Sequence, residues 1–226
     1  MSLIDSLIQE GWLKTPRIID AFRKIKRVDF LPEDIKDLAE LNEALPIGSG
    51  QTISQPLVVA FMIELLEPQP GDKILDIGSG SGWTSAILSE IVSQNGRNKK
   101  GRVIAIEIIP ELKEFGERNV IKYNFIEKGI AEFICADGSK GYPNISTRPE
   151  LVEGFDKILA SASARELPRA WKEQLKIGGR IVTPIGNSIW LFIKKSPSAA
   201  KAKEGKEVEF EEVEYPGFVF VPLIEK

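Results

Sequence analysis

A glycine-rich segment at residues 75–85, LDIGSGSGWTS, has residue types and spacing that could bind a ligand. It follows a short apolar run and precedes a helical pattern, which is the context in which glycine loops bind nucleotides. Asp76 is followed by alternate glycines that begin at Gly78. Trp83 stands where the dinucleotide fingerprint needs its third glycine, and no Gly-Lys-Ser/Thr follows, so that fingerprint and the P-loop are both excluded. The alternative is a tight turn without a ligand.

Two further acidic residues stand near the ends of predicted strands. Glu107 closes the strand expected over 102–108, and Asp137 with Gly138 closes the one over 131–138. A carboxylate at the end of the second strand can accept hydrogen bonds from both hydroxyls of a ribose. Asp137 could meet an adenine amino group, although Asp-Gly is also a common turn pair. Alone, Glu107 would be an ordinary surface acid, but after this glycine loop it favours a nucleoside site.

An uncharged stretch, PIGSGQTISQP, occupies residues 46–56 of a chain that is 28% charged. Its glycines allow the backbone to approach a ligand closely, and Thr52 and Ser54 would lie on one side of an extended segment. Hydroxyls and backbone N–H groups can orient an anion without neutralising it. We therefore expect this surface loop to hold a charged reactant. As an alternative, Ser54 could cap the helix that begins at Pro56.

The composition excludes several kinds of chemistry. The 226 residues include no histidine, which removes the commonest general base and most zinc sites, and we predict no metal. The net charge of −3 offers no surface suited to nucleic acid or an anionic membrane. One cysteine suits a reducing compartment, and the N-terminal residues lack the basic region of a secretory signal. We expect a cytoplasmic monomer that binds neither nucleic acid nor membrane.

The elements that must position these residues follow from hydrophobic periodicity. Short apolar runs alternate with helical patterns, which predicts an α/β fold with a doubly wound, mostly parallel sheet and helices on both faces. Strands are expected over 73–78, 102–108, 131–138, 155–162 and 178–186. Two last strands without a helix between them should pair antiparallel at one edge. Ligands of such sheets bind beyond the carboxyl ends of the strands, so the candidate residues should gather there.

The whole chain, 1–226, is expected to form a single domain with three parts. Residues 1–45 carry helical patterns over 2–9, 16–25 and 32–41 and would form an N-terminal cover. Residues 46–195 would form the cofactor-binding and catalytic core. Residues 196–226 would form a mobile, low-complexity loop and a C-terminal edge strand. A second polar loop is expected over 93–101.

Taken in order, these motifs resemble the protein-L-isoaspartate (D-aspartate) O-methyltransferase family, whose members are Rossmann-like class I methyltransferases. The resemblance covers about residues 18–223 and rests on LPIGSGQTISQP, GDKILDIGSGSGW, ADGSKGYP, FDKILASASARELP and QLKIGGRIVTPIG. The chain departs from the family by having no histidine, where members usually carry one near the position of Asp29. Residues 161–163 replace a Thr-Ala-Ala-like run, and residues 145–154 look like an insertion.

The resemblance implies methyl transfer from S-adenosylmethionine to the free carboxylate of L-isoaspartyl residues in damaged peptides and proteins. Repair of the damage then begins, and S-adenosylhomocysteine is the product. A carboxylate, with a reference pKa of about 4, is already ionised at neutral pH, so a chain without histidine is chemically consistent with this reaction.

The resemblance also assigns site residues. Ser54 and Thr52 would be catalytic, and Ser54, Ser161 and Ser163 would bind the peptide. The cofactor would be held by Gln51, Ile53, Asp76, Gly78, Ser79, Gly80, Glu107, Asp137 and Gly138. Two other functions stay open: a class I methyltransferase with a small-molecule or RNA acceptor, and a module that binds the cofactor without catalysis.

Overall fold

The computed structural model of the chain describes residues 2–94, 101–143, 154–196 and 209–224. The predicted loops over 93–101 and 196–207 and the predicted insertion over 145–154 lie almost entirely outside the described residues.

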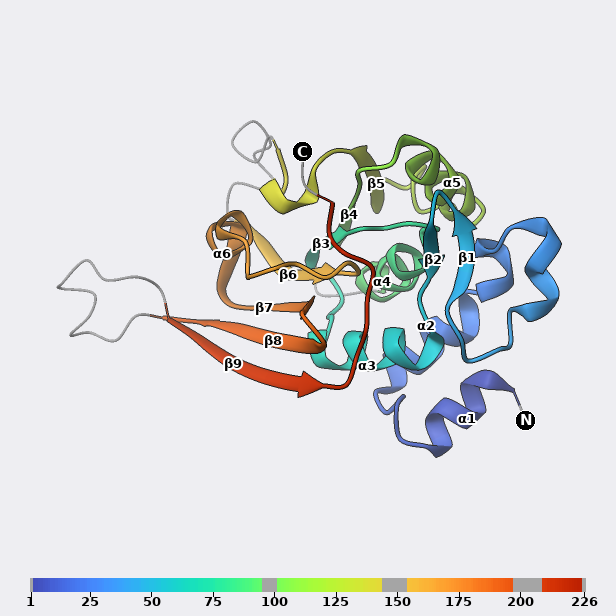
Figure 1. The fold of residues 1–226 in the computed structure, drawn as a ribbon, viewed down its shortest axis with the longest axis horizontal. Helices are drawn as coiled ribbons and strands as arrows, with labels where there is room; N and C mark the ends of the chain where they lie inside the picture. Colours follow the sequence, from blue (N-terminus) through green and yellow to red (C-terminus); the bar gives the residue numbers. More distant parts are fainter. Residues whose placement is uncertain (1, 95–100, 144–153, 197–208, 225–226) are drawn as a thin grey trace.

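A seven-stranded sheet, in the order β5-β4-β3-β6-β7-β8-β9, forms the centre of the molecule (Figure 1). The first five strands in this order pair in parallel, and β8 and β9 continue the sheet from β7 in antiparallel pairs. This confirms the predicted doubly wound, mostly parallel sheet with an antiparallel edge. The strands are β3 (Lys73–Ile77), β4 (Arg102–Glu107), β5 (Ala131–Cys135), β6 (Phe155–Ala160), β7 (Leu175–Ile185), β8 (Ser188–Lys195) and β9 (Glu209–Pro216).

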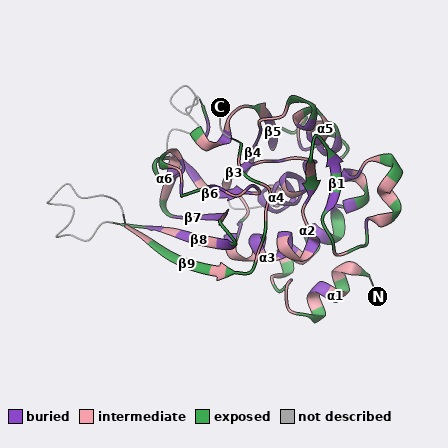
Figure 2. Ribbon diagram, viewed as in Figure 1, coloured by how far each residue is buried: buried purple, intermediate pink, exposed green. Residues whose placement is uncertain are grey.

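Alternate side chains of the sheet pack into two apolar cores. Ile74 and Val103 belong to the core that includes α3, α4 and α5, whereas their neighbours Leu75 and Ile104 pack with Trp171 of α6 on the other face. This is the period of two expected of strands. Figure 2 shows buried residues concentrated in the central strands and α4. The α-helices are α1 (Leu3–Gln9), α2 (Pro16–Lys24), α3 (Pro56–Leu66), α4 (Trp83–Ser93), α5 (Pro110–Ile121) and α6 (Arg169–Gln174).

The N-terminal residues cover α4. Phe22 of α2 is buried, and its ring meets that of Trp83 edge to face with the centroids 5.7 Å apart. The third helix, expected over 32–41, is a short 3-10 helix, η2 (Glu33–Leu38), and another, η1 (Arg27–Phe30), precedes it. None of the residues of η2 is buried, although Ile35 and Leu38 pack against the core while partly exposed. With so small an apolar face, a short α-helix would have little to stabilise it.

The stretch over 46–56, expected to be a loop, contains a β-hairpin. β1 (Leu45–Gly48) pairs antiparallel with β2 (Gln51–Ile53). Ser49 and Gly50 connect them at φ +51° and +69°. Positive φ at both central residues is what a type I′ turn requires, and this turn matches the twist of the paired strands. The turn chemistry, which is a local signal, explains why the stretch forms a hairpin.

The C-terminal edge strand is shorter than expected. β9 ends at Pro216, and Gly217, at φ +97°, begins a segment that leaves the sheet and runs across the strand ends (red in Figure 1). There the Ser163 N–H donates to the Val221 carbonyl and the Leu223 N–H donates to the Ser163 carbonyl, both at 2.8 Å. Among the helices within the described ranges, none has the length and hydropathy needed to cross a membrane.

Candidate active site

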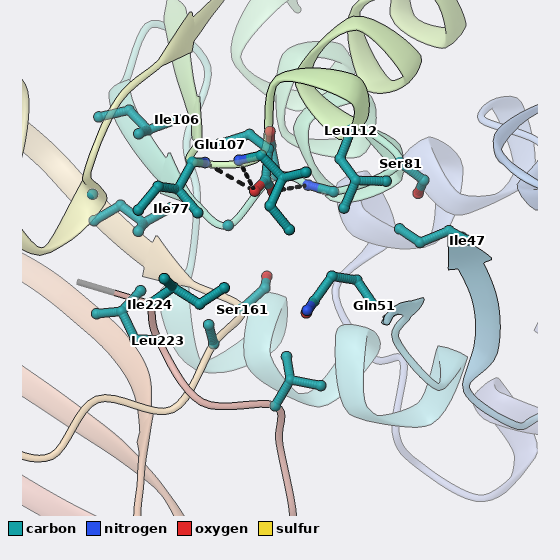
Figure 3. A pocket seen from close by; sticks show the side chains of 18 of the residues that line it. Ile47, Gln51, Ile77, Ser81, Ile106, Glu107, Leu112, Ser161, Leu223 and Ile224 are labelled. Carbon is teal, nitrogen blue, oxygen red and sulfur yellow. Dashed lines mark hydrogen bonds between the residues drawn. The ribbon is translucent and has the colours of Figure 1, made fainter. Parts of the chain in front are cut away.

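A cleft lies at the carboxyl ends of β3, β4 and β6 (Figure 3). From β3, the chain first adds β4 and β5 on one side and then returns to add β6 and β7 on the other. Doubly wound sheets leave a crevice at such a reversal. Between its walls the cleft holds about 750 Å³ of space, part of it open to solvent.

The glycine loop after β3 forms one wall of this cleft. Gly78, Gly80 and Gly82 have φ values of +74°, +50° and +83°, which residues with a Cβ rarely adopt. A Cβ on Gly82 would also lie 2.7 Å from the carbonyl oxygen of Gly116 in α5. The loop is therefore held close against α5, and Gly78, Ser79 and Gly80 all line the cleft.

Glu107 enters the cleft from the end of β4 (Figure 3). Its carboxylate accepts backbone N–H groups from Gly80 at 2.9 Å, Ile108 at 2.9 Å and Ile109 at 3.0 Å. These bonds fix the carboxylate between the glycine loop and the turn into α5. Among the described residues that line the cleft, Glu107 is the only one with a charged side chain. The cleft therefore carries a negative charge that suits a cationic ligand.

Asp76 lies behind the glycine loop and is not among the residues that line the cleft. It is fully buried, and its Oδ2 accepts a hydrogen bond from the Ser85 hydroxyl at 2.6 Å. Its Oδ1 has no partner within the described part of the chain. Burial raises the pKa of Asp76 to about 7, with a further contribution from Glu107, against the opposing effect of the Ser85 hydrogen bond. The geometry gives Asp76 a contact with α4 through Ser85.

Asp137 also lies outside the cleft, whereas Gly138 lines it. The Asp137 carboxylate accepts hydrogen bonds from the Ser139 N–H at 3.0 Å and from the Ser139 hydroxyl at 2.6 Å, and it pairs with Lys140 at 3.1 Å. These are the contacts of a turn residue at the start of η3 (Gly138–Lys140). A Cβ on Gly138 would lie 2.4 Å from Ile77, so the close approach of this turn to β3 requires glycine.

The hairpin supplies the opposite wall. Gln51, Thr52, Ile53 and Ser54 all line the cleft, and the Gln51 side chain reaches into it (Figure 3). Ile53 also packs into the core. The alternative role for Ser54 as a helix cap is wrong, because α3 has Gln55 at its N-cap position and no side-chain capping bond.

A second cavity adjoins the cleft. Both cavities are lined by Thr52, Ser54, Ser161 and Val221, and the second is completed by Ala44, Gln55, Val58, Val219 and Phe220. The Ser161 hydroxyl faces the cleft (Figure 3). Ser163 lines neither cavity, and its hydroxyl donates to the Gly186 carbonyl at 3.4 Å.

Sequence reasoning missed the apolar walls of the cleft. Ile77, Ile106 and Leu112 line it from β3, β4 and α5, and the segment at 221–224 lines it from the C-terminal part of the chain. The apolar strand ends carried a signal, because residues that end parallel strands lie at the binding edge. The segment at 221–224 carried no such signal in the sequence, because its contact with Ser163 joins distant parts of the chain.

The residues of the cleft fit S-adenosylmethionine. The apolar walls suit a flat purine, and the Glu107 carboxylate suits ribose hydroxyls. No cation lines the described part of the cleft to oppose a positively charged sulfonium. The buried hydroxyl of Ser79 has no hydrogen-bond partner among the described residues, which leaves a polar atom for a ligand to satisfy.

Comparisons with known proteins agree with this geometry. The sequence model of the protein-L-isoaspartate(D-aspartate) O-methyltransferase family matches residues 1–226. A protein-L-isoaspartate O-methyltransferase of Methanopyrus kandleri is 38% identical over 226 residues, which cover 98% of this chain and 89% of the relative. One of Staphylothermus marinus is 36% identical over 222 residues, with coverage of 98% and 92%.

The fold is also similar to a solved structure. A chain from Plasmodium falciparum, described as a protein-L-isoaspartate O-methyltransferase in complex with S-adenosyl-L-homocysteine, superposes with a TM-score of 0.81. The match covers 99% of this chain and 97% of that one at 21% identity.

Proposed function

The chain belongs to the protein-L-isoaspartate (D-aspartate) O-methyltransferase family, and on that premise we propose that it methylates the free carboxylate of L-isoaspartyl residues in peptides and proteins. One observation carries the proposal: two adjoining cavities share a border formed by Thr52, Ser54, Ser161 and Val221. A reaction between a nucleoside cofactor and a peptide carboxylate needs two binding sites that meet at one point.

The cleft is the cofactor side of this border. S-adenosylmethionine supplies a methyl group carried on a positively charged sulfur. Glu107 would hold the ribose hydroxyls, Gly78 to Gly80 would offer backbone groups, and Gln51 and Ile53 would close the site from the hairpin. Ile77 and Ile106 would pack against the purine. Asp76 would act from outside the cleft, by holding α4 through the Ser85 hydroxyl.

The second cavity is the peptide side. Thr52 and Ser54 stand at the border, where their hydroxyls can donate hydrogen bonds to an acceptor carboxylate. This carboxylate is ionised at neutral pH, so the residues need only orient it and exclude water. The exposed side chain of Val219 and the half-buried one of Phe220 give the peptide an apolar surface.

Two peptides that differ only in an Asp or isoAsp linkage test the proposal. IsoAsp lengthens the main chain by one carbon and moves the free carboxylate onto the α-carbon, so a border that fixes the carboxylate can distinguish the two. With labelled S-adenosylmethionine, we expect base-labile methyl ester on the isoAsp peptide and very little on the Asp peptide. Equal labelling would indicate a general carboxyl methyltransferase. No labelling while S-adenosylhomocysteine binds in calorimetry would favour a small-molecule acceptor or a binding module.

A series of serine variants tests the border residues. We expect Ser54→Ala to lower kcat/KM for the isoAsp peptide at least about tenfold, the value of one hydrogen bond to a charged group, with unchanged affinity for S-adenosylhomocysteine. Ser163→Ala is the matched control, because Ser163 lines neither cavity, and it should keep full activity. Unchanged kcat/KM in Ser54→Ala would remove this hydroxyl from the reaction.

We extend the proposal to a monomer that works in the cytoplasm with isoaspartyl peptides and proteins as its partners, and with neither nucleic acid nor membrane. The support is the net charge of −3 and the single, exposed, unpaired cysteine. Sedimentation equilibrium would test the monomer, and filter binding with RNA at low salt would test the absence of nucleic-acid binding.

A further inference from the structure

The guanidinium of Arg27, in η1, is buried against the main chain on both sides of the hairpin. Its Nη1 donates to the carbonyls of Ala39 at 3.2 Å and Leu41 at 2.8 Å. Its Nη2 donates to the carbonyls of Glu43 at 2.7 Å and Ser54 at 3.4 Å. One side chain therefore holds the residues that lead into the hairpin together with the residue that follows it.

Arg27 makes these contacts as a charged group. The residue is only 6% exposed, and burial lowers its pKa to about 10, partly offset by the charge of Glu40. It is still protonated at neutral pH. Burial of a guanidinium is costly unless hydrogen bonds compensate for the lost water. Here neutral carbonyls accept from Nη1 and Nη2, whereas Nε has no partner among the described residues. This is a costly way to stabilise a fold, and it points to a need for fixed geometry at this place.

Arg27 also touches the other wall of the cleft. Its Cζ lies over the Trp83 ring, 5.5 Å from the centroid, at the distance of a cation–π contact. Trp83 is the first residue of α4, directly follows Gly82 and lines the cleft. The same guanidinium thus contacts the residue that follows the glycine loop and the carbonyl of Ser54 at the end of the hairpin.

The turn that carries Arg27 is anchored independently to the two residues that directly follow α5. The Tyr123 hydroxyl donates to the Asp29 carboxylate at 2.6 Å, and Lys122 donates to the Asp29 carbonyl at 2.8 Å. From α5 itself, the Asn119 amide donates to the Ser81 carbonyl in the glycine loop at 3.0 Å. η1 is therefore tied to the C-terminal end of the helix that also supports the cofactor wall.

We propose that Arg27 is a positioning residue, which sets the hairpin against the glycine loop and so places Thr52 and Ser54 beside the cofactor. The reaction that this placement serves is the proposed function, on which this part of the inference rests. The anchorage of the hairpin rests only on the contacts above. Lysine cannot replace arginine here, because its donors all lie on one atom and it lacks a planar face for Trp83.

Hydrogen exchange tests the anchorage without any substrate. In the complex with S-adenosylhomocysteine, Arg27→Lys should raise exchange at the amides of residues 45–54 and leave those of β9 unchanged. Arg180→Lys is the matched control. Arg180 is also largely buried, donates to the Leu65 carbonyl at 2.9 Å and pairs with Glu67 at 2.9 Å, at the opposite end of α3 from the hairpin. Hydrogen exchange at the amides of residues 45–54 in Arg180→Lys should equal that of the wild type.

Kinetics test the positioning. Arg27→Lys should lower kcat/KM for the isoAsp peptide at least about tenfold, while the Kd for S-adenosylhomocysteine stays within about threefold, because Glu107 and the glycine loop remain in place. Arg180→Lys should lower the melting temperature without this loss. Wild-type hairpin exchange in Arg27→Lys would overturn the proposal. So would a Kd that rises in proportion to the loss of kcat/KM, because the defect would then lie in the cofactor wall.

The anchorage by Arg27 can be tested even if the wild-type chain has no isoAsp activity or Arg27→Lys does not fold. If the wild-type chain labels neither peptide, the proposed function fails, and hairpin exchange still decides the anchorage by Arg27. If Arg27→Lys does not fold, Tyr123→Phe probes the same anchor, because it removes the hydroxyl that joins Asp29 to the Lys26 N–H. A smaller rise in hairpin exchange is then expected, and unchanged exchange would overturn the proposal.

Discussion

The two ends of the parallel strands hold their carboxylates by different means. At the carboxyl end, Glu107 accepts three backbone N–H groups and Asp76 accepts one hydroxyl. At the amino end, Asp156 accepts the Lys73 N–H at 2.8 Å and pairs with Lys176 at 2.9 Å. An ion pair helps to hold Asp156 at one end, whereas hydrogen bonds to neutral groups hold Glu107 and Asp76 at the other.

This difference shows which end can bind a cation. An ion pair cancels most of the field of a carboxylate, whereas N–H groups fix its position and leave its negative charge in place. The amino end is therefore a stable closure of the sheet. The carboxyl end keeps a charge in the cleft. Behind it, burial raises the pKa of Asp76 to about 7, with a smaller contribution from the charge of Glu107.

The largest effect is expected from Asp76→Asn. The folded pKa of Asp76, about 7, is above its unfolded value of 3.8. The native chain therefore holds this proton more tightly, and stability is lost as the pH rises towards 7. Asparagine removes this dependence. From pH 5 to pH 8, the free energy of unfolding of the variant should gain about 3 kcal/mol relative to the wild type.

Thermal melts across this pH range measure the gain. A difference in melting temperature between variant and wild type that stays constant with pH would mean that Asp76 is already ionised in the folded chain. The difference between the two ends of the sheet would then be smaller than the structure indicates.

Glu107→Ala should have the next largest effect. It removes the carboxylate that would bind the ribose and leaves the N–H groups of Gly80, Ile108 and Ile109 without their acceptor. We expect the affinity for S-adenosylhomocysteine to fall by about 1.5–3 kcal/mol, measured by calorimetry. Glu107→Gln keeps one acceptor oxygen, so its affinity for S-adenosylhomocysteine should lie between those of Glu107→Ala and the wild type. Wild-type affinity in Glu107→Ala would show that Glu107 does not hold the cofactor.

At the opposite end, Asp156→Ala should affect stability alone. It removes the ion pair with Lys176 and the acceptor of the Lys73 N–H, so the free energy of unfolding should fall by about 1 kcal/mol. Denaturant titration measures this loss. The Kd for S-adenosylhomocysteine should equal that of the wild type. A weakened Kd would mean that the two ends of the sheet are coupled.

The smallest effect tests the charge of the cleft. Thr84 lines the cleft, and Thr84→Lys would place a cation there. S-adenosylmethionine is positively charged at sulfur and S-adenosylhomocysteine is not, so the variant should weaken the first more than the second, by about 0.5–1 kcal/mol. Thr84→Met, the uncharged control, should weaken both equally. An equal loss of both ligands in Thr84→Lys would mean that charge in the cleft does not select the cofactor.

The parts of the molecule that follow local rules were predictable. The alternation of strands and helices, the glycine loop and the place of Glu107 at the end of β4 all follow from hydrophobic period and glycine spacing. Both are properties of neighbouring residues. The hairpin was missed although it is local, because three- and four-residue strands show too little alternation to distinguish them from a loop. The remaining signal in the sequence was the pair Ser49-Gly50, whose residue types suit the two central positions of a hairpin turn.

By itself, the sequence determined the order of the elements, the uncharged character of the stretch at 46–56 and the family. Only the tertiary structure decided that Asp76 lies behind the cleft, that Ser163 lines neither cavity, and that residues 221–224 cross the strand ends. It also decided that Arg27 holds the carbonyl of Ser54. The contacts of Ser163, of residues 221–224 and of Arg27 join segments far apart in the chain through hydrogen bonds to main-chain groups. Every residue carries such groups, so no residue type or spacing in the sequence marks which of them will pair.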